Sequence, residues 1–151
     1  MSNKIVVNTG KSYFAKICVT GGAGNKYINT YVQAHLYVNS YTPVSTSVLS
    51  NFTELTAGSV PGYAPQTLTG ATDGGIDANN WDTWTFTTLT FQATGGPPVP
   101  YPCYGAFFTD PTGAILLWAE LFPSVFTFTN NGDGFTLIPT MSVGSIFGNT
   151  P

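Results

Sequence analysis

Hydrophobic and polar residues alternate with a period of two along residues 27–39, YINTYVQAHLYVN. One face of this segment would carry Ile28, Thr30, Val32, Ala34, Leu36 and Val38, and the other Tyr27, Asn29, Tyr31, Gln33, His35, Tyr37 and Asn39. Successive side chains of a β-strand point to opposite faces, so the pattern predicts a strand with one face in the core. The side chains that we expect in the core are Ile28, Val32, Leu36 and Val38. Those that we expect outside or in an interface are Tyr31, His35 and Tyr37.

Further strands are predicted along the chain. Residues 12–19 form one, ended by the glycine-rich segment 20–25, and residues 81–94 alternate with a slip at Thr87-Thr88 that predicts a β-bulge. Residues 103–109 and 114–122 flank Asp110-Pro-Thr-Gly113, which has the signature of a type I turn and therefore predicts a hairpin. A second turn at 130–134 is expected to join strands 125–129 and 135–141. The proline-rich segment 95–102 is not expected inside a sheet, because proline lacks the donor that a ladder needs.

Together these patterns predict an all-β fold: a single antiparallel β-sandwich or jelly roll of eight or nine short strands. No segment of ten or more residues shows helical spacing with caps. Residues 40–80 contain only the short strand candidates 52–56 and 66–69. We expect an N-terminal arm at residues 1–11 and one domain over residues 12–151.

Charge is scarce, with 11 charged residues among 151, no arginine and a single histidine. The four lysines all lie in the first 26 residues, and the seven acidic residues all come later. Two interpretations stay open for residues 1–26: an arm attracted to an acidic neighbour, or a solvated first strand. Lys4 and Lys11 flank the β-prone triplet Ile5–Val7, which predicts an arm that adds a strand to a neighbouring chain.

The inventory of reactive groups favours no catalytic site and no cofactor. His35 is the only histidine and is expected to be a half-exposed strand residue among tyrosines. Glu120 interrupts an apolar strand and is expected either on the solvated face of an edge or partnered across strands. Asp73, Asp77 and Asp82 loosely resemble a calcium loop but do not match an EF-hand, which favours a solvated turn.

Cys18 and Cys103 are too few for a disulfide framework and form no zinc motif. Two buried thiols are expected, and a single bridge stays open as the alternative. No apolar run reaches the length of a membrane span, and the start of the chain lacks the apolar region of a secretory signal. The absence of arginine and a pI of about 4.6 make nucleic acid a poor partner.

Aromatic side chains are the remaining candidates for recognition. Trp81 and Trp84, with Tyr101 and Tyr104 beyond the proline-rich segment, would form either a sugar platform or a protein-contact surface. Our predicted interface residues are Lys4, Ile5, Val7, Lys11, Trp81, Trp84 and Tyr101.

Four stretches carry a resemblance to a known group of proteins. They are Ala34-His-Leu-Tyr-Val-Asn39, Asn51-Phe-Thr-Glu-Leu-Thr56, Gly62-Tyr-Ala-Pro-Gln-Thr-Leu-Thr69, and Tyr104-Gly-Ala-Phe-Phe-Thr-Asp110 followed by Leu116-Leu-Trp-Ala-Glu120. Their order resembles small all-β structural proteins of tailed bacteriophages, over residues 30–143.

The resemblance implies a virion structural protein without catalytic residues. The expected role is that of a capsid cement or decoration protein, a homotrimer on the outer capsid surface that binds the major capsid protein. The alternatives are a tail, baseplate or fibre component, and a carbohydrate-binding module; an enzyme comes last.

Overall fold

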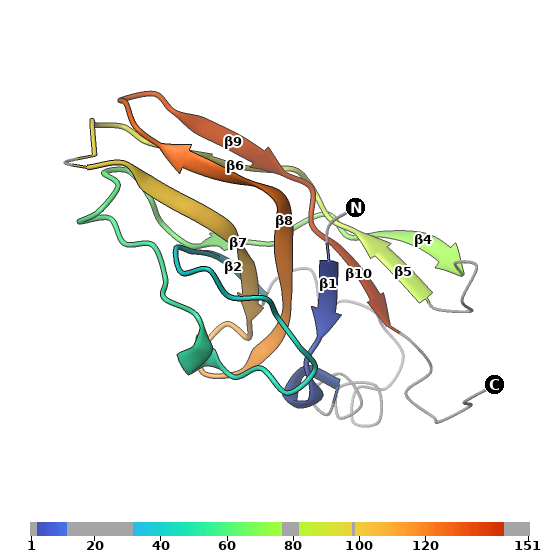
Figure 1. The fold of residues 1–151 in the computed structure, drawn as a ribbon. Helices are drawn as coiled ribbons and strands as arrows, with labels where there is room; N and C mark the ends of the chain where they lie inside the picture. The colour runs from blue at the N-terminus through green and yellow to red at the C-terminus, as the bar shows by residue number, and fades with distance from the viewer. Residues whose placement is uncertain (1–2, 12–31, 77–81, 98, 144–151) are drawn as a thin grey trace.

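The computed structural model describes residues 3–11, 32–76, 82–97 and 99–143, and these residues form an antiparallel all-β fold (Figure 1). The predicted fold class is confirmed. The strands are β1 (Asn3–Val6), β2 (Gln33–Tyr37), β3 (Gln66–Thr67), β4 (Thr72–Ile76), β5 (Asp82–Thr85), β6 (Leu89–Gln92), β7 (Tyr101–Thr109), β8 (Leu116–Phe128), β9 (Gly134–Leu137) and β10 (Thr140–Val143).

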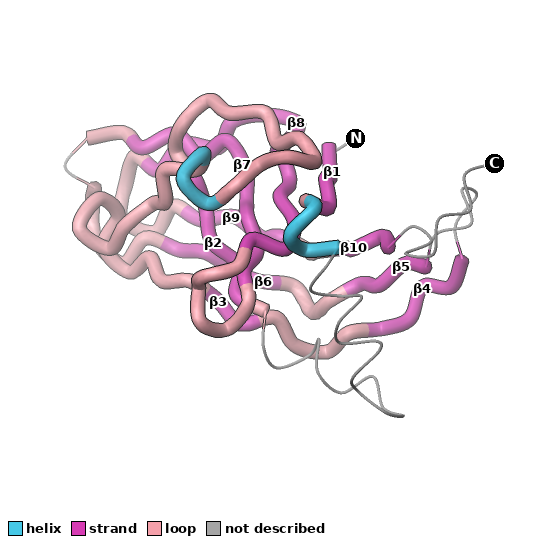
Figure 2. Tube along the Cα trace, turned by 90° about the horizontal axis from the view of Figure 1, so that it is seen from below, coloured by secondary structure: helices cyan, strands magenta, loops and turns pink. Residues whose placement is uncertain are grey.

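Helical structure in the described residues is limited to a turn at residues 8–11 and the 3-10 helix η1 (Leu49–Asn51), both drawn in cyan in Figure 2. Neither of these segments has the length or apolar character of a membrane-crossing helix.

Three sheets make up the fold. The largest has the strand order β1-β8-β7-β2-β3, and the smaller two have the orders β10-β5-β4 and β6-β9. The β7–β8 hairpin confirms the turn predicted at Asp110–Gly113, where the Gly113 N–H donates to the Asp110 carbonyl over 3.0 Å. Both figures show the β10-β5-β4 sheet extending to one side of the remaining strands.

The main apolar core lies between the five-stranded sheet and the two smaller sheets. From the large sheet, Leu36, Phe108 and Trp118 are buried, and the rings of Phe108 and Trp118 stack with centroids 4.2 Å apart. Phe91 of β6 and Met141 of β10 close the same core from the other layer. Side chains of both layers therefore meet in one interior, as in a sandwich.

The outer face of the large sheet is also covered, which the sequence pattern did not predict. Phe107 on this face stacks against Phe52, with centroids 5.2 Å apart, and Phe52 meets the ring of Tyr37 edge-on. A second buried cluster therefore forms beneath the segment that leads from β2 to η1 and Phe52.

This second cluster corrects the predicted orientation of β2. Val32, Ala34 and Leu36 lie in the main core as predicted, and Val38 packs against it. The outward placement of His35 and Tyr37 is wrong, because their relative exposures are 7% and 0%. The reason is that strand alternation separates two faces but does not say whether a distant loop covers the second one. Ile28 and Tyr31 lie outside the described residues.

The N-terminal strand pairs within its own chain. Antiparallel β1 places Lys4, Ile5 and Val6 opposite Glu120, Ala119 and Trp118 of β8. Val7 follows with no exposed surface and belongs to the second cluster. The expectation that Ile5–Val7 adds to the sheet of a neighbouring chain is therefore wrong, because the outer edge of β8 already supplies the hydrogen-bond partners.

Several strand predictions need correction. At Thr87-Thr88 the chain passes from β5, which pairs with β4 and β10, to β6, which pairs with β9, so the slip marks a change of sheet and not a bulge. The turn at 130–134 is present, but β8 runs without interruption to Phe128 and β9 pairs with β6 rather than β8.

Of the two short strand candidates, one forms a strand and the other does not. Segment 66–69 contains β3, whereas segment 52–56 makes only an isolated bridge between Glu54 and Tyr37. Strand β4 was not predicted. Pro102 lies in β7, opposite Thr127 of β8 and beyond the residues of β7 that pair with β2, where the described part of β7 has a paired strand on one side only. Predicted strand 12–19 lies outside the described residues.

Replacing Leu36 by alanine is expected to lower the free energy of unfolding by about 2–5 kcal/mol, because the side chain is fully buried and leaves a cavity. Urea denaturation measures this change. The matched control is Thr90→Ser on the exposed face of β6, which should change stability by less than about 0.5 kcal/mol. Equal stabilities for the two variants would contradict the placement of Leu36 in the core.

Replacing Val7 by alanine is expected to destabilise the isolated protein by about 1–3 kcal/mol, since two buried methyl groups are lost. A separate arm awaiting a partner would show no such loss. The control is Lys11→Gln, four residues further on, whose side chain is exposed. Thermal unfolding of the two variants distinguishes an integrated first strand from a free arm.

Candidate functional site

Lys4 and Trp84, two of the predicted interface residues, lie on strands β1 and β5, which both contact β10. Lys4 on β1 donates a hydrogen bond from Nζ to Oγ1 of Thr140 on β10. The next residue of β10, Met141, pairs with Trp84 of β5, whose ring is partly buried against the main core. These contacts bring the two residues to the side where the β10-β5-β4 sheet extends (Figure 1).

The other predicted residues do not join that group. Tyr101 begins β7 opposite Phe128 and packs partly buried against the core, at the end of β7 that lies far from β10 in Figure 1. Lys11 is exposed on the helical turn, Ile5 is partly buried and Val7 is fully buried. Trp81 lies outside the described residues. The set is therefore divided over several regions, and an aromatic platform formed by Trp84 with Tyr101 is not present.

The exposed surface carries very little charge. Among the residues whose exposure is described, Lys4, Lys11 and Asp73 are the exposed charged residues, and Glu54 and Asp133 are partly exposed. Two of the acidic residues, Asp110 and Glu120, are instead buried at 5% exposure each. Large apolar side chains that are about half exposed are Val44, Val48, Val99, Val125 and Ile138. The described surface is accordingly composed mostly of hydroxyl, amide and apolar groups.

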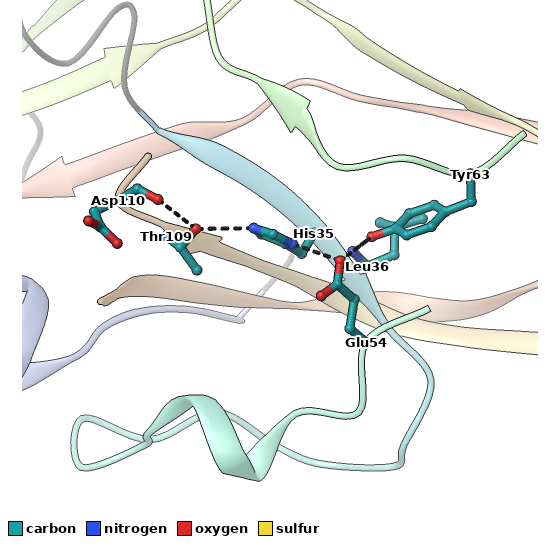
Figure 3. A network of polar contacts seen from close by, with 6 residues as sticks. All are labelled: His35, Leu36, Glu54, Tyr63, Thr109 and Asp110. Atoms are coloured by element: carbon teal, nitrogen blue, oxygen red, sulfur yellow. Dashed lines mark hydrogen bonds and ion pairs between the residues drawn. The ribbon is translucent and has the colours of Figure 1, made fainter. Parts of the chain in front are cut away.

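A network of polar contacts is centred on His35 of β2 (Figure 3). His35 Nδ1 is 2.8 Å from Glu54 Oε1, and His35 Nε2 is 3.0 Å from Thr109 Oγ1. The hydroxyl of Thr109 donates in turn to the carbonyl oxygen of Asp110 over 2.9 Å. The imidazole ring stacks on Phe107, with centroids 4.7 Å apart and an interplanar angle of 8°.

Tyr63 extends the network on the side of Glu54. Its hydroxyl accepts the backbone N–H of Leu36 over 2.9 Å and donates to Glu54 Oε1 over 3.2 Å. Burial raises the pKa of Tyr63, and the Glu54 carboxylate adds to that effect. The hydroxyl therefore stays protonated and keeps its role as a donor to Glu54.

The network joins one polar side chain from each of four separate sequence stretches, 34–39, 51–56, 62–69 and 104–110. His35 comes from the first stretch, Glu54 from the second, Tyr63 from the third and Thr109 from the fourth. Sequence reasoning found His35 but missed its partners, because residues 19, 28 and 74 positions away show no shared pattern until the chain folds. Glu54 and Tyr63 lie in stretches with several other polar residues, so nothing in the sequence distinguished them.

The order carboxylate, imidazole, hydroxyl resembles that of a hydrolase triad, but the geometry favours a structural role. Thr109 has an exposure of 1%, and its hydroxyl is hydrogen-bonded to the carbonyl of the next residue. A nucleophile needs access to a substrate and a hydroxyl proton that the base can remove. This hydroxyl meets neither requirement in the described conformation. The arrangement instead fastens the Glu54 segment and the β7–β8 turn to β2.

The β7–β8 turn is itself fixed by the Asp110 carboxylate. Its Oδ1 accepts the backbone N–H groups of Ala114 and Ile115 at 2.9 and 2.8 Å, and its Oδ2 accepts the hydroxyl of Thr112 at 2.6 Å. Desolvation by burial opposes the charge, but the hydrogen bonds from Thr112, Ile115 and Ala114 outweigh it and lower the pKa of Asp110. The position of Thr109 beside His35 is set by this turn.

The remaining candidate groups show no reactive arrangement in the described part of the chain. Cys103 is a fully buried free cysteine, as predicted, and burial raises the pKa of its thiol to about 12. Glu120 is buried on β8, opposite Lys4 and Ala106, and is not on a solvated face. The solvated turn expected for Asp73 and Asp82 is wrong, because Asp73 lies in β4 and Asp82 in β5, which pair with each other; the exposed Asp73 carboxylate accepts the N–H of Gly75 over 2.7 Å. Cys18 and Asp77 lie outside the described residues.

Metal-binding groups are likewise scattered: no cluster of three or more histidine, cysteine, aspartate or glutamate side chains occurs within residues 3–11, 32–76, 82–97 and 99–143. Comparisons of this chain with family models, curated proteins and solved structures found no match. The function is therefore argued from the residues themselves.

Replacing Asp110 by asparagine is expected to destabilise the protein at pH 7 by about 1–3 kcal/mol, because the backbone N–H groups of Ala114 and Ile115 lose a charged acceptor. A lowered carboxyl pKa contributes stability above the ordinary aspartate value of about 3.9, and the contribution disappears as the pH falls through the folded-state value. The difference between wild type and variant should therefore shrink in acid.

Urea denaturation at several pH values between 2 and 7 tests this prediction. Asp73→Asn is the control, because that carboxylate is exposed and should contribute little at any pH. A stability difference for Asp110→Asn that is independent of pH would contradict the assignment.

Proposed function

We propose that this chain is a virion structural protein, a capsid cement or decoration protein that binds the major capsid protein on the outer surface of the shell. The observation that carries the proposal is the low charge of the described surface, which carries Lys4, Lys11 and Asp73 as exposed and Glu54 and Asp133 as partly exposed charged residues. The sequence resemblance to small all-β phage structural proteins supports the same role. Binding would be by adhesion, without turnover.

The composition of the surface favours contact with other proteins on physical grounds. A charged group loses strong hydration when a neighbouring protein covers it, and this cost offsets much of the attraction that it gains. The centres of protein interfaces are accordingly depleted in charged residues and contain apolar anchors. Hydroxyl and amide groups with interspersed Val44, Val48, Val99, Val125 and Ile138 suit a protein that is covered by neighbours.

The β10-β5-β4 sheet offers a second means of attachment. In the described residues β4 pairs with β5 alone, so one edge of this sheet presents backbone groups that a strand of a partner could pair with. Trp84 lies on the central strand of this sheet and is incompletely buried. We therefore expect Trp84 to anchor the protein to its partner. Self-association as a trimer would use the same kind of contact.

The interior of the domain supports adhesion as well. Its buried His35 and Asp110 side chains hold segments of the chain together and do not line an accessible reactive site. A cement protein must present a fixed surface against the pressure of packaged DNA. A network that fastens loops to the central sheet contributes to that rigidity.

Particles that lack this protein are expected to release DNA at a lower temperature than complete particles. In complete particles, quantitative mass spectrometry should give a copy number comparable with that of the major capsid protein. A copy number of only a few per particle, or equal heat resistance with failed adsorption to the host, would instead identify a tail or receptor-binding component.

Trp84→Ala is expected to lower the occupancy of the protein on particles and their heat resistance, provided that the purified variant still folds. Thr90→Ser is the matched control, since Thr90 is exposed on the separate β6-β9 sheet. Full occupancy and unchanged heat resistance for Trp84→Ala would rule out this anchor. Binding of the isolated protein to glycans would favour the carbohydrate-binding alternative.

A further inference from the structure

The turn that joins β8 to β9 is fixed by the Asp133 carboxylate and by the end of β6. Asp133 Oδ2 accepts the backbone N–H groups of Thr129 and Asn130, each over 2.7 Å. Ala93, directly after β6, donates its N–H to the Asp133 carbonyl over 2.8 Å and accepts the N–H of Gly132 over 2.9 Å. The turn and the end of β6 are therefore joined as one hydrogen-bonded unit.

The shape of this turn requires a glycine at position 132. The Asp133 N–H donates to the Asn130 carbonyl over 3.2 Å, so residues 130–133 form a β-turn, and Gly132 at its third position has a φ of +89°. The residue before it, Asn131, is exposed, and the two residues are the only Asn-Gly pair in the sequence. The turn thus places an exposed asparagine before a residue that has no side chain.

An Asn-Gly pair undergoes a reaction that needs no other residue. The backbone nitrogen of Gly132 loses its proton and bonds to Cγ of Asn131, and the side-chain amide nitrogen leaves as ammonia. Water then opens the five-membered succinimide ring at one of its two carbonyl groups. The product is aspartate, or isoaspartate, in which the main chain runs through Cβ and Cγ and is one methylene longer. Glycine favours the reaction because no side chain shields its nitrogen, and the space beside Gly132 is open.

The folded turn restrains this reaction. The Ala93 carbonyl holds the N–H of Gly132, and the turn fixes the backbone angles on either side of that nitrogen. Ring closure requires the nitrogen to give up this hydrogen bond and its peptide plane to rotate toward Cγ of Asn131. Ala93 is buried in the main core, so its carbonyl does not follow that rotation. The attack therefore depends on a local opening of the turn.

We propose that Asn131 is a site of spontaneous deamidation that the folded turn protects, and that its conversion to isoaspartate loosens the turn from β6. The added methylene lies between Asn131 and Gly132. It shifts the Gly132 N–H and the Asp133 carbonyl, which are the two groups that bind Ala93. Modification and opening of the turn therefore promote each other. The inference goes beyond the proposed function and does not depend on it.

Peptide mass spectrometry of the wild-type protein tests the protection directly. The protein is incubated folded, and unfolded in guanidinium chloride, at the same pH and temperature, and chymotrypsin then releases residues 129–135 between Phe128 and Phe135. Asn131 should lose its amide at least about tenfold more slowly in the folded protein than in the unfolded chain. Asn130 in the same peptide is the internal control, because the residue after it has a side chain, and it should react much more slowly than Asn131 in the unfolded chain. Equal rates for Asn131 in the two states, or no reaction of Asn131 in the unfolded chain, would overturn the proposal.

Asp133→Ala tests whether the turn is the source of the protection. The variant removes the acceptor of the Thr129 and Asn130 N–H groups, so the folded variant should deamidate at Asn131 about 3–10-fold faster than folded wild type. The two unfolded chains should react at similar rates. Thr90→Ser is the control and should keep the wild-type rate in both states. An unchanged rate in the folded Asp133→Ala protein would show that this turn does not protect Asn131.

Native-state hydrogen exchange of the separated isoaspartate form tests the loosening of the turn. The Ala93 amide, which donates to the Asp133 carbonyl, should exchange about 3–10-fold faster in this form than in wild type. Asn131→Asp is the matched control, because it supplies the new carboxylate without the added methylene and should keep nearly the wild-type exchange rate. Equal exchange of Ala93 in the isoaspartate form and in wild type would contradict the proposed loosening.

Discussion

The large sheet of this protein is covered on both faces, and the other parts of the structure are arranged around that constraint. On β7, Ala106 and Phe108 enter the main core, whereas Phe107 enters the second cluster and Thr109 meets His35. Gly105 is required where the ring of Tyr37 crosses β7, because a Cβ there would overlap the Tyr37 hydroxyl and the carbonyl of Glu120. The loop after β2, with Val7 just after β1, covers the outer face of the sheet, which therefore has no solvated face at its centre.

The sequence predicted those features that depend on neighbouring residues. Alternation located Val32, Ala34 and Leu36 in the main core, and the turn signature at Asp110–Gly113 located the β7–β8 hairpin. The sequence did not predict that Phe52 covers Phe107, that β1 pairs with β8 or that β9 pairs with β6. Each of these contacts joins segments that are far apart in the chain. His35 was identified, but its burial was not, because burial depends on that same distant cover.

Charged residues are few in this protein, and some of them are buried. The His35 network satisfies its polar groups from four separate segments of the chain. Polar groups that are buried must find such partners, so a buried network fixes the relative positions of its segments more strictly than apolar packing alone. A firmly held interior beneath a nearly neutral exterior is consistent with a protein that adheres to its neighbours.

Native-state hydrogen exchange is the most direct test of this organisation. The slowest amide groups should be those of β7 around Ala106 and Phe108, which have strands on both sides and side-chain layers on both faces. These amides should exchange only through global unfolding, and those of β4, which pairs with one strand in the described structure, should exchange much faster. Exchange at β7 as fast as at β4 would contradict an account built on a central sheet covered on both faces.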